Sequence, residues 1–484
     1  MVTIDVLPDD TLLEIFDFHV VGYQDLDIYD VVLGDSYSPV KSEIESWQSL
    51  VHVCRRWRNI VFGSPRRLDL QIYCIPNPFA GPEISLDYWP DLPLHIEGSV
   101  SEMSVNNVIV ELKLSDCIYQ INLKFNKTSY IKKLWRGMQM PFPELAVLCL
   151  SNVNSSNVPV LPNSFLGGSA PRLRYLSLRC IPFPGLPNLL LSTTHLVHLH
   201  LLQIPVSGYI SPEAMATCLS TLTCLESFRL VFESDPHQEI RPFPPPTRTR
   251  SVLPALTSFR FDGVDKYLED LLSRIDAPRL DKLSASFNDL IFEDNVPELI
   301  QLIHRSPTFG AYDEARLIFF NCEALVRLQS HPEPSDYRVV EVCAMCVIAD
   351  WQPESLTGIC AFSSLRCLLT MENLYIHENL HSPPDWEDDI ENTVWWDLLL
   401  PFTAVKNLYL SKKIAPLIAP ALQNLTEERT TEVLPTLKNV LLEGFHPSEP
   451  IEEGIAQFVS TRRLTSHPIA VSHWDRYDEL MWEL

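Results

Sequence analysis

Apolar residues recur along the middle of the chain in the frame Leu-x-x-Leu-x-Leu. The clearest copies are Leu145/Leu148/Leu150, Leu173/Leu176/Leu178, Leu196/Leu199/Leu201 and, with phenylalanine in place of some leucines, Leu225/Phe228/Leu230 and Leu256/Phe259/Phe261. The copies start at residues 145, 173, 196, 225 and 256, so the interval between them varies from 23 to 31 residues. Intervals of this size are typical of solenoids, in which repeats of about 20 to 45 residues stack on their neighbours.

Each copy of the frame predicts a short β-strand, because its last two apolar positions alternate with other residues and point to one face. Between the strands, segments that open with Ser or Pro and have apolar residues at helical spacing predict helices. These helix candidates are residues 211–219, 266–275, 296–305 and 415–425. Stacked units of this kind make a parallel sheet whose strands are covered by helices on one face.

The frame continues, less regularly, on both sides of these copies. Weaker copies begin at Leu280, Val405 and Leu437, and degenerate strands are predicted at Tyr312/Ala315/Leu317, Tyr337/Val340/Val342 and Met371/Leu374/Ile376. Before the first copy, residues 65–73, 92–97 and 108–114 are interpreted as strands and residues 131–135 as a short helix. Near the C-terminus, residues 451–464 predict a helix, and residues 474–484 are expected to cap the last repeat.

The repeat resembles the leucine-rich repeat family across most of residues 66–446. In that family an Asn or Cys usually follows eight positions after the first Leu and satisfies backbone groups of the loop. The equivalent positions hold Val153, Ile181, Ile204, Glu233, Val264, Asn288, Lys413 and Phe445, so only Asn288 agrees. The resemblance implies an α/β solenoid with a parallel sheet, followed by a C-terminal helix and cap in residues 447–484. The departure predicts irregular turns rather than a regular horseshoe.

Two N-terminal segments have a different pattern, that of short amphipathic helices. In the first, Leu12, Phe16 and Val20 fall on one helical face, after a Pro and two Asp residues that favour a helix N-terminus. In the second, apolar residues recur at steps of three and four from Trp47 to Val61, until Gly63 and Pro65 end the pattern. Helices this short leave apolar surface for a partner or for the following domain.

These two segments resemble the F-box family. Its pattern is a Leu-Pro, an acidic residue and a Leu-Leu-x-x-Ile-Phe helix, followed by a Val-Cys-Arg-x-Trp helix, and residues 7–16 and 53–57 match it in order. Family members usually have only about a dozen residues between the two helices. Residues 21–45 separate them in this chain and, with their Gly, Pro and Asp residues, are interpreted as an inserted loop within a module of residues 1–65.

The F-box resemblance implies a function through partners. The module would bind the Skp-type linker of a Skp/cullin/F-box ubiquitin ligase, and through it cullin, while the repeat domain binds an unknown protein substrate. The linker-binding residues that the resemblance implies are Leu7, Pro8, Leu12, Ile15 and Phe16 in the first segment and Val51, Cys54 and Trp57 in the second. The alternative is a leucine-rich-repeat scaffold or protein-binding module that joins no ligase.

Charge and cysteine usage narrow the choice of partners. The 484 residues carry 37 Lys and Arg against 62 Asp and Glu, a formal net charge of −25. This charge repels nucleic acid and anionic membrane surfaces, so neither is an expected partner, and it favours a basic protein partner. The 12 Cys are scattered, mostly in apolar runs, and no apolar segment has the roughly 18 residues needed to span a membrane. We expect an intracellular protein, cytoplasmic or nuclear.

Candidate chemistry is sparse. Cys343 and Cys346 have the spacing of half a zinc site, but no second Cys-x-x-Cys accompanies them, and their apolar surroundings favour buried structural thiols. His198 and His200 alternate with Leu199 and Leu201 and are expected on the opposite face of a strand, as solvent-facing residues rather than as a metal-binding pair. Phosphate-binding loops, zinc-protease motifs and nucleophile elbows are absent from the sequence. We therefore expect an adaptor without catalytic residues, metal or cofactor.

Overall fold

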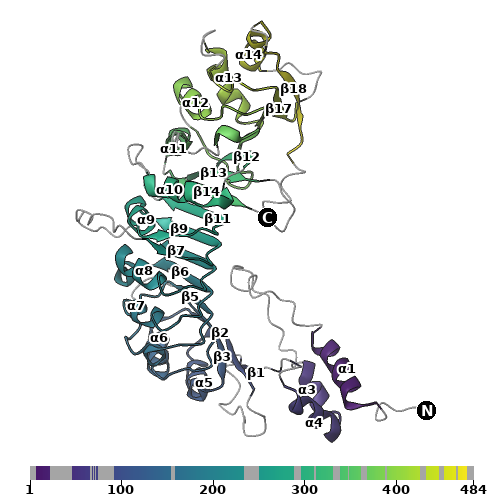
Figure 1. Cartoon of the computed structure of the whole chain (residues 1–484), viewed down its shortest axis with the longest axis vertical. Helices are drawn as coiled ribbons and strands as arrows, with labels where there is room; N and C mark the ends of the chain where they lie inside the picture. Colours follow the sequence, from purple (N-terminus) through teal and green to yellow (C-terminus); the bar gives the residue numbers. More distant parts are fainter. Residues whose placement is uncertain are drawn as a thin grey trace.

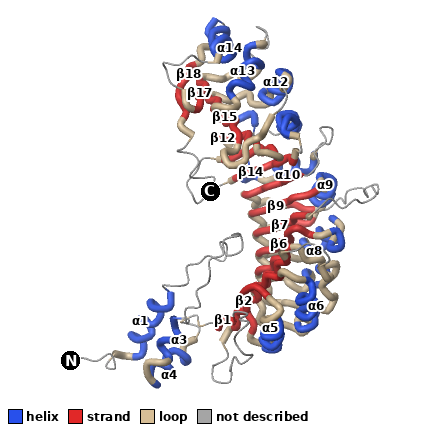
Figure 2. Tube along the Cα trace, turned by 180° about the vertical axis from the view of Figure 1, so that it is seen from behind, coloured by secondary structure: helices blue, strands red, loops and turns tan. Residues whose placement is uncertain are grey.

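A long, mostly parallel sheet with helices along one face is the main body of the protein. The computed structural model describes residues 7–21, 46–65, 68, 70, 72–74, 92–153, 158–233, 250–287, 296–309, 312–330, 338–346, 348–360, 368–386, 390–425, 432–445, 452–464 and 467–476. Within these residues, sixteen strands form one sheet in the order β1-β2-β3-β4-β5-β6-β7-β9-β11-β14-β13-β12-β15-β16-β17-β18. The strands stack along the long axis of the molecule, and the helices lie on one side of them (Figures 1 and 2). We call the other side of the sheet the open face.

The strands of this sheet are short. They are β1 (Ile72–Cys74), β2 (Leu94–Val100), β3 (Ile118–Phe125), β4 (Val147–Asn152), β5 (Tyr175–Arg179), β6 (His198–Ile204), β7 (Ser227–Phe232), β9 (Ser258–Gly263), β11 (Lys282–Phe287), β12 (Glu314–Phe319), β13 (Glu323–Gln329), β14 (Val339–Met345), β15 (Asn373–Glu378), β16 (Asn407–Leu410), β17 (Asn439–Glu443) and β18 (Ala470–Trp474). A separate pair, β8 (Ser251–Val252) and β10 (Ile275–Asp276), lies at the return path.

The helices of the solenoid occupy the return paths between strands. They are α5 (Val105–Glu111), α6 (Thr128–Gly137), α7 (Leu186–Leu190), α8 (Pro212–Leu219), α9 (Asp265–Leu272), α10 (Pro297–Arg305), α11 (Gln352–Cys360), α12 (Asn392–Leu399), α13 (Ala415–Gln423) and α14 (Glu453–Leu464). Short 3-10 turns are η3 (Leu112–Leu114), η4 (Phe165–Gly168), η5 (Val206–Gly208), η6 (Pro307–Phe309), η7 (Ala349–Trp351) and η8 (Leu368–Thr370). Among the described residues, three further helices, α1 (Asp9–Val21), α3 (Ser46–Val51) and α4 (Arg55–Gly63), lie together beside the β1 end of the sheet (Figure 1).

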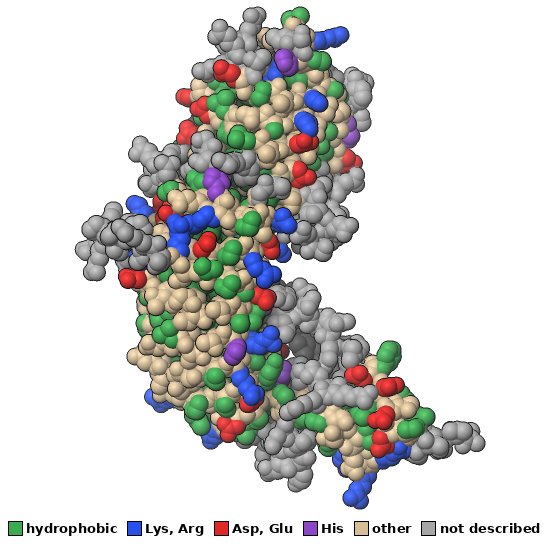
Figure 3. Space-filling view, viewed as in Figure 1, with side chains coloured by type: hydrophobic (Ala, Val, Ile, Leu, Met, Phe, Trp, Pro, Cys, Tyr) green, Lys and Arg blue, Asp and Glu red, His purple; other side chains and the backbone are tan. Residues whose placement is uncertain are grey.

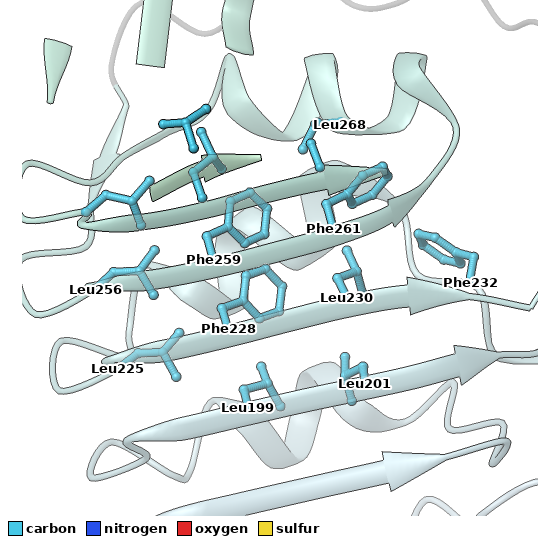
Figure 4. Packing of buried hydrophobic residues seen from close by; sticks show 14 of the residues in the cluster. Leu199, Leu201, Leu225, Phe228, Leu230, Phe232, Leu256, Phe259, Phe261 and Leu268 are labelled. Atoms are coloured by element: carbon cyan, nitrogen blue, oxygen red, sulfur yellow. The ribbon is translucent and has the colours of Figure 1, made fainter. Parts of the chain in front are cut away.

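The repeated frame builds the core between the sheet and the helices. In β7 and β9 the alternate residues Phe228, Leu230, Phe259 and Phe261 point toward the helices and are at most 1% exposed. They continue the ladder that Leu199 and Leu201 begin in β6 (Figure 4). The rings of Phe228 and Phe259 stack with centroids 5.3 Å apart and an interplanar angle of 4°. Each repeat therefore buries its apolar residues against its neighbours, as expected of a solenoid.

The regular stacking is interrupted between β11 and β15. After β11 the chain passes through α10 to β12, which pairs in parallel with β15 rather than with β11. It then returns through the antiparallel pairs β12–β13 and β13–β14, so that β14 pairs in parallel with β11. The sheet stays continuous, but the order of three strands is reversed relative to the sequence.

Most of the predicted elements are confirmed, including the strands of every strong and weak copy of the frame and the helices α6, α8, α9, α10, α13 and α14. Two interpretations of the fold are wrong. Residues 108–114 belong to α5 and η3, because Val105, Val108 and Leu112 are buried at helical spacing. The sheet is not wholly parallel, since β13 is antiparallel to both neighbours. Strands β3, β13 and β18 of this sheet were not predicted from the sequence. The predicted inserted loop of residues 21–45 lies, apart from Val21 at the end of α1, outside the described residues.

Candidate functional site

The N-terminal helices form a small unit held by aromatic packing. The ring of Trp57 in α4 lies 4.8 Å from that of Phe16 in α1, and Trp47 in α3 lies 6.3 Å from Phe62 in α4. The second predicted helix is broken into α3 and α4. Cys54, in extended conformation, separates them, and its thiol accepts the Trp57 N–H at 3.5 Å to cap α4.

A contact that sequence reasoning missed ties this unit together. The Arg56 guanidinium donates to Asp9 Oδ1 and to the main-chain oxygen of Leu7, both at 2.6 Å. The Pro8 carbonyl in turn accepts the Leu12 N–H at 3.0 Å, the first hydrogen bond of α1. Arg56 thus fixes the Leu7-Pro8 segment against α4.

The eight predicted linker-binding residues fall into two groups by burial. Leu12, Phe16 and Val51 are buried and make up the core of the unit, whereas Leu7, Cys54 and Trp57 are half-buried and Pro8 and Ile15 are exposed. Two exposed apolar residues, Phe18 and Val53, were not predicted as contacts. Ile15, 43% exposed, and Phe18, 86% exposed, are three residues apart in α1 and therefore share a face of the helix.

Strands β6, β7 and β9 carry basic side chains on the open face, and we call this part of the face the basic middle. Strand register places His200 of β6 beside Arg229 of β7, and Arg229 beside Arg260 of β9. Lys, Arg and His side chains, with Asp and Glu side chains between some of them, lie along the edge of the molecule opposite the helices (Figure 3).

The two histidines of β6 lie on the open face, as predicted, but they are not both solvent-facing. His200 is buried, with Nδ1 2.9 Å from the Tyr175 hydroxyl and Nε2 3.2 Å from Ser227 Oγ. Burial, followed by the charges of Arg229 and His198, lowers the pKa of His200 to about 3. His200 is therefore a neutral hydrogen-bonding residue that supports its neighbours.

On strands β15, β16 and β17, which we call the upper part of the open face, asparagine and tyrosine side chains form rows across the strands. Asn439 donates to Asn407 Oδ1 at 2.7 Å, and Asn407 donates to Asn373 Oδ1 at 2.8 Å, joining β17, β16 and β15. One step along the strands, the rings of Tyr375 and Tyr409 stack at 4.0 Å. These rows stabilise the sheet on the face that carries no helices.

The segment after β18 closes part of this upper face. Arg476, 3% exposed, donates to His377 Nδ1 at 2.8 Å and to the main-chain oxygen of Glu378, and its guanidinium lies 3.4 Å from Glu378 Oε1. Burial and the Arg476 charge lower the pKa of His377 to about 3, so Nδ1 remains free to accept. The segment after β18 thus covers the C-terminal end of β15 on the open face.

The remaining candidate chemistry is structural. Cys346 is buried with its thiol 3.2 Å from Ser355 Oγ, and Cys343 donates to Glu323 Oε2 at 3.5 Å. Among the described residues, no cluster of three or more His, Cys, Asp and Glu side chains has a metal-binding arrangement. None of the helices in the described part of the chain has the length and apolar character needed to cross a bilayer.

Comparison with known proteins adds little. No protein-family model matches the chain, and no curated protein does. Solved structures do match, among them the leucine-rich repeat-containing protein LegL7 from Legionella pneumophila, at 12% identity over 82% of this chain and 98% of that one, with a TM-score of 0.26. We base no argument on so low a TM-score. The chain's own repeated frame and its long, mostly parallel sheet define an irregular α/β solenoid of leucine-rich-repeat-like character.

Proposed function

We propose that the chain is the substrate-recognition subunit of a Skp/cullin/F-box ubiquitin ligase. The proposal is carried by one observation: the residues that match the F-box pattern fold into a compact three-helix unit beside the solenoid, with apolar side chains left exposed. The unit would dock on the Skp-type linker, and the solenoid would bind a protein substrate. The mechanism is positional, since holding a substrate near the ubiquitin-loaded conjugating enzyme raises the effective concentration of its lysines.

Burial separates two roles among the predicted contact residues. Leu12, Phe16 and Val51 shape the unit from inside, so their truncation would unfold it rather than report on docking. Pro8 and Ile15 are the exposed members, and an apolar side chain of this kind is a usual anchor of an interface. Ile15 is therefore the position at which docking is tested without disturbing the core.

The test compares two exposed apolar residues at opposite ends of the protein. Ile15→Asp is expected to abolish recovery of the linker and of cullin in a pull-down from cells, because a carboxylate would be desolvated in the interface. Leu464→Asp, at the exposed end of α14, is the matched control and is expected to leave recovery unchanged. Failure of the wild-type chain to recover linker and cullin, while it retains another stable partner, would favour the non-ligase scaffold.

A further inference from the structure

The basic middle of the open face contains two neighbouring arginines, Arg229 and Arg260, for which no ion pair is found among the described residues. We define the basic strip as Arg174 and Arg179 at the two ends of β5, Arg229 in β7, Arg260 in β9 and Lys282 at the start of β11. Strands β5, β6, β7, β9 and β11 are consecutive neighbours in the sheet. A chain of net charge −25 thus carries five cationic side chains in or next to four of these five strands, β5, β7, β9 and β11.

Arg229 and Arg260 lie side by side on neighbouring strands. Neither makes a hydrogen bond or ion pair with another residue that the structure describes. Like charges directly opposite on neighbouring strands destabilise a sheet. Burial, and after it the neighbouring charge of Arg260, lower the pKa of Arg229.

Other arginines of the sheet have carboxylate partners. Beyond β11, Arg327 in β13 pairs with Glu341 in β14 at 2.8 Å, and Arg316 in β12 is paired with Glu314. At the strip, Glu226 precedes β7, and Asp262 lies two residues after Arg260 in β9, opposite Val231 rather than opposite Arg229. Within the described part of the chain, the arginine pair thus differs from Arg327 and Arg316 in having no carboxylate in ion-pair contact.

We propose that the basic strip binds an acidic, extended segment of the partner protein, with carboxylates reaching Arg229 and Arg260. Five strands have four spacings of about 4.8 Å, so the strip is about 19 Å long, which an extended segment of about six residues spans. Several cations spread over this length suit a run of Asp and Glu better than one isolated phosphate. The proposal deepens the proposed function, because it gives the chemical class of the substrate segment.

This inference reverses the expectation from net charge. An acidic chain as a whole favours a basic partner, but the local field at a recognition surface is set by the nearest charges within about 10 Å at moderate salt. The acidic remainder of the protein would also repel a long polyanion such as a nucleic acid. The strip thus favours a short acidic protein segment over nucleic acid.

The experiment measures fluorescence anisotropy of a labelled peptide of alternating Glu and Ser with the full-length chain at low ionic strength. Binding is expected to weaken about tenfold or more in the double variant Arg229→Gln/Arg260→Gln, because two charge-assisted hydrogen bonds are lost. The matched control, Lys132→Gln/Lys133→Gln on the exposed surface of α6, removes the same charge and is expected to bind as the wild type does.

Three outcomes would overturn the inference: no binding of the Glu peptide by the wild-type chain, an equal loss in the control variant, or tighter binding of single-stranded DNA than of the peptide. Linker recovery by the Arg229→Gln/Arg260→Gln variant separates this inference from the proposed function. If the variant and the wild type recover the linker equally but the peptide does not bind, the acidic-segment inference fails alone.

Discussion

Glu111 offers a prediction about stability that follows from one buried charge. This residue ends α5, where the helix dipole disfavours a carboxylate, and its Oε2 is buried without a hydrogen-bond partner. Burial raises the pKa of Glu111 to about 7, from 4.5. Because the folded pKa is raised, the protonated side chain favours the fold below about pH 4.5, and this contribution is lost as pH rises toward 7.

Glu111→Gln removes the charge while keeping the shape. The pKa difference corresponds to an upper limit of about 3.4 kcal/mol, and solvent reaching part of the carboxylate reduces the expected gain to about 1–2 kcal/mol at about pH 8. At about pH 5 we expect only a small gain. The assay is urea unfolding followed by far-UV circular dichroism at both pH values, with Glu432→Gln, at an exposed loop position, as the control. A gain of equal size at both pH values would refute the reasoning.

Three further predictions concern the sheet. Phe259→Ala, which removes a fully buried ring stacked on Phe228, is expected to lower the free energy of unfolding by about 3–5 kcal/mol, measured by urea unfolding; a loss below 1 kcal/mol would contradict the packing. Arg476→Ala leaves the buried Glu378 without its guanidinium partner, and we expect a loss of about 3–5 kcal/mol in the same assay, with no loss meaning that the segment after β18 does not close the face. Asn407→Ala breaks two ladder hydrogen bonds, and faster amide exchange in β16 and β17 than in β5 is the expected result, whereas uniform exchange would contradict it.

The sequence pattern predicts the solenoid well because its cause is local. Two alternating apolar residues per strand, such as Phe228 and Leu230, are enough to decide which face is buried. The reversed order of β12, β13 and β14 was not predictable, since the repeated frame does not include β13 and the choice of neighbour depends on non-local pairing. The segment around Val108 was misread because Val and Ile favour strands by propensity, while burial at helical spacing decided the outcome.

In the candidate site, too, the local features were predictable from the sequence and the contacts between distant residues were not. The F-box-like pattern predicted the N-terminal helices, but the break at Cys54 depends on an unusual thiol cap, and the clamp from Arg56 to Asp9 joins residues 47 positions apart. The basic strip was also missed. Its arginines belong to separate repeats, so only the stacking of β7 on β9 brings Arg229 and Arg260 together, and net charge averages over that arrangement.

The most direct test of the account is calorimetric titration of the purified full-length chain with a recombinant Skp-type linker. We predict a complex of one linker per chain that is lost in Ile15→Asp, is retained in Leu464→Asp, and is unchanged in the Arg229→Gln/Arg260→Gln variant, because the open face lies apart from α1 (Figure 1). A wild-type chain that is folded by circular dichroism and yet gives no heat of binding with the linker would contradict the central claim.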